Sequence, residues 1–502
     1  MLVAVAENVK SHCSSPGEST GLNVPSRSIV MVSFMTTIAV SLLALSPSSA
    51  VAQSLPTNGQ VRAGQASIAQ PNGNTMMVNQ GSQRAVIDWN TFNVGQGKTV
   101  QFNQPNARAQ ALNRVVGGVP STIQGSLLAN GQVLIQNANG VLFSKGSVVN
   151  VGSLLATTKA IDANGFMAGG PLSLSSTGTS AGVVNDGSIQ AQGFVVLMGD
   201  QVRNTGAIST AKGGQVALAA GDSATVALPN GQGISLTLTN ASANALVENS
   251  GSILAQDGNV LLTARGKDTL LDTVINLSGV VRAGTVVADA GNTGDLAVTG
   301  KIDASDLSAG AVGGTVVLAG DRVGLFGNGS VDVSGDAAGG NVVMGGDSLN
   351  RIGGTQAAGM MSGVNFANYT QVDSGASIKA DSVHGNGGFV ETSGHRLDVA
   401  GKVSAAGGGN GQGGQWLIDP TDVTISSLPD SNYGGAVTGG FDGGSNTTAN
   451  VQNTSINNAL NAGTDVTITT AREGLQNPFS ARGLFAARAT TLQTCCGAGH
   501  RF

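Results

Sequence analysis

The chain has 502 residues, of which 76 are Gly, 11% are charged and 3% are aromatic, and its formal net charge is −5. Charged residues are less than half as frequent as the roughly 25% of an ordinary globular protein, and this composition excludes a helical enzyme. It also excludes collagen, because Pro numbers only 12 and Gly has no strict three-residue period. Abundant Val, Ile, Leu, Ala, Ser, Thr and Asn favour short strands joined by polar turns.

The first 52 residues have the pattern of a secretory signal. Residues 29–45 are an apolar run after Arg27, and the small residues that follow end in Ala50-Val51-Ala52 before Gln53. An apolar segment followed by A-x-A is typical of a signal peptide and its cleavage site. We therefore predict cleavage between Ala52 and Gln53; a membrane anchor is the alternative.

Residues 1–28 are long for the basic segment of a signal peptide. They resemble the second half of the extended signal peptide region of large secreted proteins from Gram-negative bacteria, whose first half is missing here. We therefore expect Met1 to be an internal methionine of a longer reading frame. The alternative is an unusually long basic segment.

Cysteine usage agrees with export. Cys13 lies in the predicted signal, Cys495 and Cys496 lie near the C-terminus, and residues 53–494 contain none. No disulfide framework is therefore expected, which suits a chain that crosses a second membrane unfolded.

Residues 53–165 contain a dense, ordered series of distinct motifs. They are Val86–Phe92, Thr99–Asn103, Ala111–Val115, Ile123–Leu127, Asn130–Phe143 and Val151–Thr158. This series resembles the haemagglutination-activity, or two-partner secretion, domain of the filamentous haemagglutinin family. The resemblance implies recognition by the periplasmic domains of an outer-membrane barrel transporter, passage in an unfolded state, and folding outside into a right-handed parallel β-helix.

The resemblance also supplies candidate secretion-motif residues. Asn113 and Arg114 come from the Ala-Leu-Asn-Arg-Val motif, and Asn137, Asn139 and Gly140 come from a motif that reads Asn-Pro-Asn-Gly in the family. Here Ala138 replaces the proline, and we expect the turn to survive because its Asn and Gly remain. The family's second motif, Asn-Pro-Asn-Leu, has no clear counterpart.

Residues 166–470 are Gly-rich and repetitive. The unit Asn-x-Gly-x-Ile-x-Ala begins at Asn185, Asn204 and Asn249, and the first two copies start 19 residues apart. A period near 20 with short strands is typical of a β-solenoid. We predict an all-β, right-handed parallel β-helix of about 20 coils, roughly 100 Å long at the spacing of neighbouring strands. Its Asn-Gly corners should use positive φ. A β-propeller, the alternative, needs aromatic repeats that the chain lacks.

The C-terminal part has two features. Gly385–Gly394 and Gly413–Ile425 are similar to a stretch of large adhesins of the same family, in which further repeats follow. Residues 471–502 are atypical, with four Arg in 32 positions. We expect a frameshifted or truncated reading frame there, and a short genuine tail is the alternative.

Residues suited to chemistry are few. His384 and His395 do not form a convincing metal site, and the carboxylate pairs Asp303/Asp306, Asp332/Asp336 and Asp419/Asp422 are interpreted as turn caps. Trp89 and Trp416 are expected in the core or at an end. We predict no enzyme activity, metal or cofactor.

The functional prediction is a secreted or cell-surface adhesin of a Gram-negative bacterium. Its expected partner is an outer-membrane two-partner secretion transporter, and its receptor is unknown. A weakly acidic, charge-poor chain predicts no binding to nucleic acid and no stable membrane insertion. The alternatives are the N-terminal fragment of a contact-dependent inhibition toxin or haemolysin and, third, a polysaccharide-active β-helix enzyme.

Overall fold

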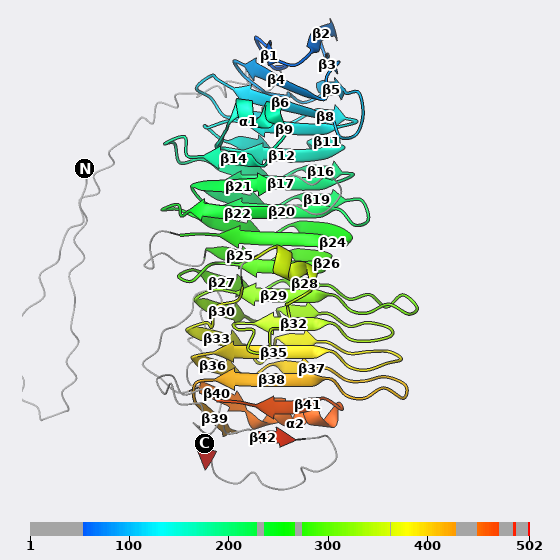
Figure 1. The fold of residues 1–502 in the computed structure, drawn as a ribbon, viewed down its shortest axis with the longest axis vertical. Coiled ribbons are helices and arrows are strands. Elements are labelled where there is room, and N and C mark those ends of the chain that lie inside the picture. Colours follow the sequence, from blue (N-terminus) through cyan, green and yellow to red (C-terminus); the bar gives the residue numbers. More distant parts are fainter. Residues whose placement is uncertain are drawn as a thin grey trace, which may run out of the picture. The chain divides into compact units, whose positions relative to one another are not determined.

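The described part of the chain winds into stacked coils whose strands form three long parallel sheets (Figure 1). The computed structural model describes residues 54–227, 235–266, 274–361, 363–427 and 449–470, together with the backbone of β42 (Phe485–Ala487) and β43 (His500–Arg501). The predicted signal peptide with Ala50, Ala52 and Gln53, and most of the atypical tail, lie outside the described residues. No helix among the described residues is long and apolar enough to cross a membrane.

Most coils contribute one strand to each of three sheets. Sheet 1 contains β3 (Thr75–Gln80), β5 (Thr99–Asn103), β8 (Ser126–Ala129), β11 (Val148–Val151), β16 (Ser188–Ala191), β19 (Ala207–Thr210), the first halves of β24 (Ser252–Ala264) and β26 (Val280–Asp289), β28 (Lys301–Asp303), β31 (Ser330–Asp332), β34 (Ser377–Lys379) and β37 (Lys402–Ser404). Sheet 2 contains β4 (Arg84–Trp89), β6 (Gln110–Val115), β9 (Gln132–Gln136), β12 (Ser153–Thr157), β17 (Phe194–Gly199), β20 (Gln215–Ala220), the second halves of β24 and β26, β29 (Thr315–Ala319), β32 (Asn341–Met344), β35 (Phe389–Gly394), β38 (Gln415–Pro420) and β41 (Asp465–Ile468). Sheet 3 contains β7 (Ser121–Ile123), β10 (Val141–Phe143), β15 (Gly182–Asn185), β18 (Gln201–Asn204), β23 (Leu246–Asn249), β25 (Ile275–Leu277), β27 (Asp295–Val298), β30 (Arg322–Leu325), β33 (Tyr369–Val372), β36 (Arg396–Val399), β40 (Ala449–Gln452) and β39 (Val423–Ser426).

This arrangement confirms the predicted all-β class and parallel β-helix, but the predicted number of coils is wrong. Sheet 2 of the described residues contains 13 strands in unbroken succession, against about 20 expected. The stack is therefore about 60 Å high at the usual strand spacing. The repeat of 19 residues holds between Asn185 and Asn204, but the next coil runs 45 residues to Asn249 because the chain leaves the helix and returns.

Apolar columns fill the interior of the stack. Val133, Leu154, Val195 and Val216 lie in register on successive strands of sheet 2 and are at most 1% exposed. One coil buries only one residue at each such position, so a dry core forms only when coils stack. The repeated asparagines form a polar column in sheet 3: Asn185 donates to Asn204 (2.8 Å), which donates to Asn249 (2.7 Å).

The Asn-Gly corners use glycine for a reason that the sequence did not reveal. Gly206, Gly251 and Gly279 do not have positive φ, so the prediction is wrong for these corners of the repeat, whereas other turn glycines such as Gly140 (φ 116°) and Gly213 (φ 77°) do have it. A Cβ at Gly206 would lie 2.1 Å from the carbonyl oxygen of Gly187, and one at Gly251 would lie 2.1 Å from that of Gly206. Glycine is required there because successive corners stack backbone on backbone.

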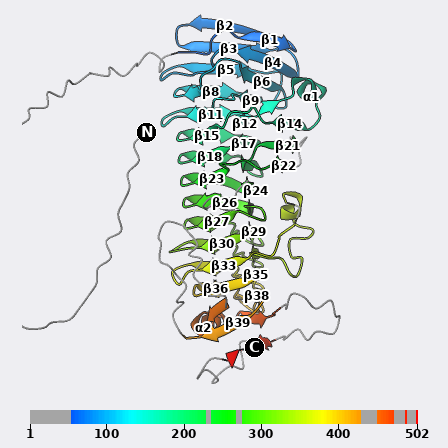
Figure 2. The same ribbon diagram turned by 90° about the vertical axis from the view of Figure 1, so that its left-hand side faces the viewer.

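A fourth sheet, which is antiparallel, covers the outer face of sheet 2. Its strands are β13 (Ala160–Ile161), β14 (Leu172–Ser175), β21 (Ser223–Ala227) and β22 (Ser235–Asn240), with α1 (Ala163–Ala168) beside them (Figure 2). We call α1 and these strands the side sheet. The outer column of sheet 2 is apolar for ten successive strands: Val86, Leu112, Leu134, Leu155, Val196, Ala217, Leu261, Val287, Val317 and Val343. These residues form one buried cluster with Phe166, Leu174 and Val226 of the side sheet.

The lower part of the same column has a different cover. Residues 345–368, between β32 and β33, pass over it and contain the short 3-10 helix η1 (Gln356–Gly359). Ile352 and Ala357 of this segment, which we call the strap, belong to the same buried cluster, and Met360 packs against it. Two unrelated local structures therefore protect one continuous apolar surface from water.

Both ends of the stack depart from the parallel pattern. At the N-terminal end, β1 (Gln60–Ala63) pairs antiparallel with β4 and β2 (Ala66–Asn72) pairs antiparallel with β3. At the other end, α2 (Asn453–Asn461) packs against β37 and β41, while β42 and β43 pair antiparallel with β41 and β39. Such caps cover sheet edges that would otherwise remain open to pairing.

Candidate functional site

The predicted secretion-motif residues lie in the first coils, on two neighbouring turns of the helix. Asn113 and Arg114 lie on β6, and Asn137, Asn139 and Gly140 form the corner after β9. Strands β6 and β9 are paired in sheet 2, and Asn113 is the register partner of Ile135. The fold thus brings the two motifs close together.

Asn113 lies inside the core. It is 0% exposed and occupies an otherwise apolar inward column between Ile87 and Ile135. Its Oδ1 accepts the indole N–H of Trp89 at 3.0 Å, and its Nδ2 donates to the carbonyl of Leu134 at 3.2 Å. A buried indole needs such a partner, so Asn113 is what allows Trp89 to be fully buried.

Arg114 faces outward and links the cap to the coils. Its Nη2 lies 2.7 Å from Oδ1 of Asp88, whose Oδ2 lies 2.9 Å from Nε of Arg62 on β1. One carboxylate is thus shared by two guanidinium groups from different strands. This charge-assisted contact fixes the antiparallel cap on the first parallel coils.

The corner at Asn137 is closed by hydrogen bonds on every side. Asn137 is 0% exposed, its Oδ1 accepts the N–H of Asn139 (2.9 Å), and its Nδ2 donates to the carbonyl of Val119 (3.0 Å). Asn139 donates to the carbonyl of Gly117 at 3.1 Å, and Gly140 has φ 116°. The turn forms without the family's proline, as expected. Both asparagines hold the loop before β7, whose Val119 is 47% exposed.

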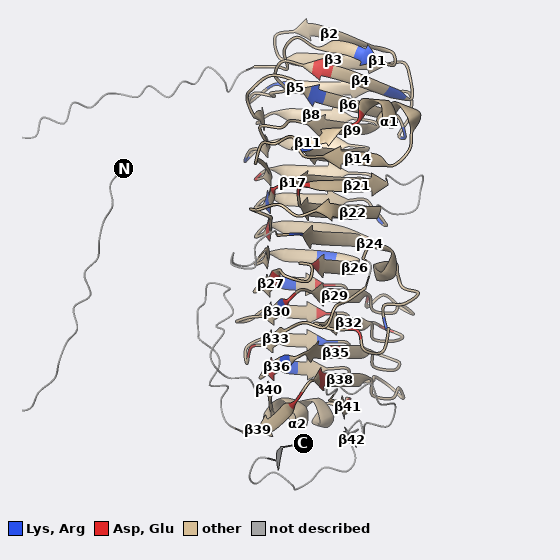
Figure 3. Ribbon diagram, turned by 60° about the vertical axis from the view of Figure 1, so that its left-hand side comes forward, with Lys and Arg blue, Asp and Glu red and all other residues tan. Residues whose placement is uncertain are grey.

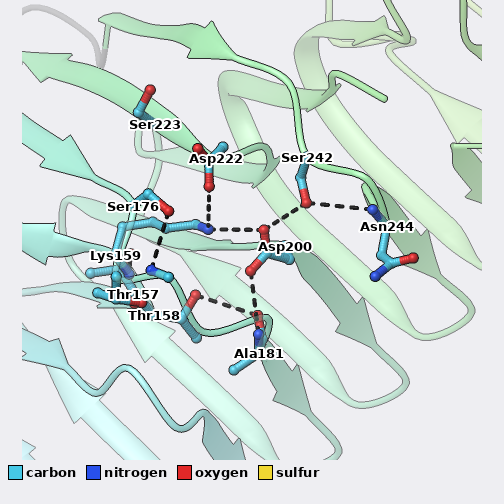
Figure 4. A network of polar contacts seen from close by, with 12 residues as sticks. Thr157, Thr158, Lys159, Ser176, Ala181, Asp200, Asp222, Ser223, Ser242 and Asn244 are labelled. Carbon is cyan, nitrogen blue, oxygen red and sulfur yellow. Dashed lines mark hydrogen bonds and ion pairs between the residues drawn. The ribbon is translucent and has the colours of Figure 1, made fainter. Parts of the chain in front are cut away.

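A buried ion network was missed from the sequence. Lys159 follows the predicted Val151–Thr158 motif by one residue and is 1% exposed. Its Nζ lies 2.9 Å from Oδ1 of Asp200 and 3.6 Å from Oδ1 of Asp222 (Figure 4). Asp200 also accepts the hydroxyl of Ser242 (2.6 Å) and the N–H of Ala181 (3.3 Å). We call these five residues the clasp.

The clasp gathers every point at which the chain enters or leaves the side sheet. Lys159 and Ala181 bracket the excursion with β13, α1 and β14, and Asp222 and Ser242 bracket the one with β21 and β22. Asp200 belongs to the coil between them. The repeated Gly199-Asp200 and Gly221-Asp222 after strands of sheet 2 are the sequence signal that points to this network.

The other residues considered for chemistry have structural contacts. His384 contacts Asp336 (2.6 Å), and His395 contacts Thr421 (3.0 Å). Within the described ranges no group of three or more His, Cys, Asp or Glu residues is arranged to hold a metal. Trp89 and Trp416 are both fully buried, which confirms their expected place in the core.

The carboxylate pairs behave mostly as expected. Asp303, Asp306, Asp332 and Asp336 each accept a backbone N–H, at 2.7 to 3.1 Å, and therefore cap turns. Asp419 differs: it accepts the hydroxyl groups of Ser348 and Thr469, so its interpretation as a turn cap is wrong. Its true role is to hold the strap, because Ser348 belongs to that segment.

Comparison with known proteins places these coils in a family. The model of the TPS secretion domain matches residues 51–305. The solved secretion domain of HMW1 from Haemophilus influenzae aligns with 73% of this chain and 95% of that one, with a TM-score of 0.62 and 26% identity.

Two heme/hemopexin-binding proteins of Haemophilus influenzae are 38% identical over 229 residues and 34% identical over 247 residues. Each alignment covers 44% of this chain, and the chain spans only 25% and 26% of the relatives' lengths. The family match extends well past residue 165, where the stack of coils also continues without a break. The boundary at 165 remains a prediction.

Proposed function

The chain belongs to the TPS secretion domain family. We propose that an outer-membrane two-partner transporter recognises the segment that forms its first coils and exports the chain as an adhesin. The match over residues 51–305 is the observation that carries this proposal. Proteins of this family pass through the periplasm to the surface of Gram-negative bacteria, and this chain shares that destination. The receptor and the activity of the complete protein belong to the proposal.

We propose that the transporter recognises the secretion-motif residues, Asn113 and Asn137 above all, before the chain folds. Asn113 and Asn137 are both 0% exposed in the folded coils, so their side chains offer nothing to a partner there. In an extended chain the same amides are free to pair with a sheet edge of the transporter's periplasmic domains. After export they bond to Trp89 and Val119 instead, which makes one set of residues serve recognition first and folding afterwards.

The adhesin role is supported by the outer face of sheet 1. Its side chains are mostly small, polar or charged, although Val148, Leu254 and Val280 are apolar and exposed. They lie in register, for example Ser188, Ala207 and Ser252 followed by Val280 and Lys301. All of these residues are exposed. Such a flat, repetitive face suits binding over a long contact rather than in a pocket, so the proposed action is binding and not catalysis.

Secretion tests the first part of the proposal. Deleting the gene of the partner barrel should remove the chain from the medium and the cell surface and leave it in the periplasm. Asn137→Ala should reduce export, whereas Asn150→Ala, on the outer face of β11, should not. Export that is unchanged without the barrel would overturn the proposal.

Attachment tests the adhesin role. Cells that lack the exoprotein should attach less to host cells or to other bacteria, and complementation should restore attachment. Unchanged attachment with loss of killing of neighbouring cells would favour a toxin carrier instead.

A second candidate function is heme or hemopexin binding, which the names of the two curated relatives suggest. The aligned segment is only about a quarter of those proteins and 44% of this chain. Titration of the purified chain with heme and with hemopexin, followed by absorbance and by pull-down, distinguishes this candidate. No binding would leave the adhesin role as the proposal.

A further inference from the structure

The charges of the chain are divided unevenly between its first coils and the rest. Residues 54–159 contain seven basic residues and a single carboxylate, Asp88, for a net charge of +6. Residues 160–470 contain 11 Lys and Arg against 25 Asp and Glu, for a net charge of −14. The basic residues of the first coils are Arg62, Arg84, Lys98, Arg108, Arg114, Lys145 and Lys159. The net charge of the whole chain, −5, therefore does not show that the two segments have net charges of opposite sign.

Folding does not neutralise the basic charge of the first coils. Arg62 and Arg114 share Asp88, and Lys159 is buried in the clasp. The other four, Arg84, Lys98, Arg108 and Lys145, have no carboxylate within 4.0 Å among the described residues.

In the later coils Lys301, Lys379 and Lys402 likewise have no carboxylate within 4.0 Å among the described residues, but most arginines are paired. There, Arg203, Arg265, Arg282, Arg322 and Arg396 all form ion pairs with carboxylates. In Figure 3, blue segments lie around β1, β4 and β6 in the first coils with one red segment among them, and both red and blue segments recur lower in the stack. The excess charge therefore has one sign at the N-terminal end and the other sign along the remaining coils.

Three of the four unpaired cations lie at corners, where a partner reaches them, and the fourth, Arg84, is the first residue of β4. Lys98 and Lys145 both lie at corners that lead into sheet 1, two coils apart, and Arg108 lies between β5 and β6. Arg108 and Lys145 are exposed and Lys98 is half-buried. At the spacing of neighbouring coils, Lys98 and Lys145 are about 10 Å apart along the stack. The corner that follows in the next coil carries Asp186 instead.

We propose that this basic segment docks on an acidic surface of the transporter's periplasmic domains and that charge attraction accelerates the encounter. The inference rests on the proposed function and adds the chemistry of recognition to it. Because the charge resides in the sequence, it acts on the unfolded chain as well, whereas the buried motif asparagines act only before folding. With one carboxylate among 106 residues, the unfolded segment has almost no internal partner for its cations, so they remain available to attract an acidic surface.

Two matched triple variants of the full chain test the proposal. Lys98→Gln/Arg108→Gln/Lys145→Gln removes three charges from the first coils, and Lys301→Gln/Lys379→Gln/Lys402→Gln removes three exposed charges from sheet 1 lower in the stack. Association with the purified periplasmic domains of the partner transporter is measured against salt concentration, and secretion is followed by pulse–chase. We expect about tenfold slower association and a weaker salt dependence for the first triple only. The double variant Arg108→Gln/Lys145→Gln changes two side chains that form no hydrogen bond with the described residues, so it should show an intermediate loss and guards against misfolding.

Three outcomes would contradict the proposal or the function on which it rests. Equal behaviour of the two triples, or binding that does not respond to salt, would overturn the inference while leaving barrel-dependent secretion intact. Loss of binding to lipopolysaccharide vesicles, with unchanged binding to the periplasmic domains, would overturn it in favour of a surface lipid partner. Secretion that continues without the barrel would reject the proposed function itself, which no outcome of the charge test mimics.

Discussion

The side sheet and the strap cover the same apolar column of sheet 2 but are fastened in different ways. The side sheet is hydrogen-bonded strand to strand, and its four crossing points meet at Lys159 and Asp200. The strap has no strands. At one end the N–H of Ser348 bonds to Glu391 (2.8 Å) and its hydroxyl bonds to Asp419, and at the other end Asn365 donates to Asn292 and Ala367 accepts the N–H of His395 (2.8 Å). Opposite charges meet in the clasp, whereas the strap is fastened by hydrogen bonds and by Arg351, whose guanidinium lies 4.4 Å from the ring centre of Phe389.

This difference leaves the strap with an unsatisfied group. Glu391 is 0% exposed and interrupts the apolar column between Val343 and Leu417. Its Oε1 accepts from Ser348 and Ser393, but its Oε2 is buried without a partner. Burial raises the pKa of Glu391, and the hydrogen bonds from the two serines only partly oppose it. The side sheet should therefore be the more stable of the two covers, and four predictions test this.

Breaking the clasp should have the largest effect. Lys159→Met leaves Asp200 buried without its cation, and loss of one member of a buried pair costs about 3–5 kcal/mol. Hydrogen exchange of amides in β14 and β21 should accelerate strongly, and an apolar dye should bind the uncovered column. Lys212→Met is the matched control, because Lys212 pairs with Asp257 at an exposed site and should leave exchange unchanged. Native-like protection in Lys159→Met would show that the strands alone hold the side sheet.

Truncating one apolar side chain in each cover should give the next largest loss of stability. Phe166 of the side sheet is 1% exposed, so Phe166→Ala should cost about 3–5 kcal/mol. Met360 of the strap is only partly buried, and Met360→Ala should cost about 1 kcal/mol. Chemical unfolding followed by exchange at single amides separates the two. If the two substitutions had equal costs, the packing of the covers would not differ as the structure indicates.

Removing the hydroxyl that fastens the strap should have a smaller and local effect. Ser348→Ala deletes the donor to Asp419 but keeps the backbone bond to Glu391, for an expected cost of about 1–3 kcal/mol. Limited proteolysis should then cut residues 345–368 faster, while the side sheet stays protected. Ser188→Ala, at an exposed site on β16, is the control. A strap as resistant as in the unmodified chain would mean that its apolar contacts suffice.

The pH response of Glu391 should be the smallest effect. Because burial raises its pKa in the folded state, the folded chain binds the proton more tightly than the unfolded chain does. Its contribution to stability is thus complete below the ordinary glutamate pKa of about 4.3 and is lost as the pH rises through the raised value. Glu391→Gln should remove this part of the pH dependence, measured as the unfolding of the strap at several pH values. Identical curves for both proteins would place the pH sensitivity elsewhere.

Local patterns predicted the coils well and their interruptions poorly. The Asn-x-Gly-x-Ile-x-Ala unit predicted that Asn185, Asn204 and Asn249 would share a position, and they lie in register. The number of coils was overestimated because the excursions that form the side sheet and the strap are not periodic. The clasp was missed because its members are 41 and 63 residues from Lys159 along the sequence (Asp200 and Asp222) and meet only when three coils have stacked.

The candidate site shows the same division. The motifs around Asn113 and Asn137 indicated which residues matter, but only the fold shows that one supports Trp89 and the other closes the corner before β7. The net charge was misleading, because an average of −5 suggested no electrostatic surface. The sequence also contains the uneven division of charge between residues 54–159 and the later coils. Only the structure shows which of these charges are paired internally, as Lys159 and Asp88 are, and which are not.

The sequence by itself determined the class of the fold, its family and its repeating core, because apolar alternation and glycine spacing act within single coils and between neighbours. Only the tertiary structure decided why glycine occupies the stacked corners, how one apolar column obtains two covers, and which charges remain available to a partner. Those properties depend on contacts between residues far apart in the chain. They arise from steric approach, burial and ion pairing, which exist only when the coils are stacked.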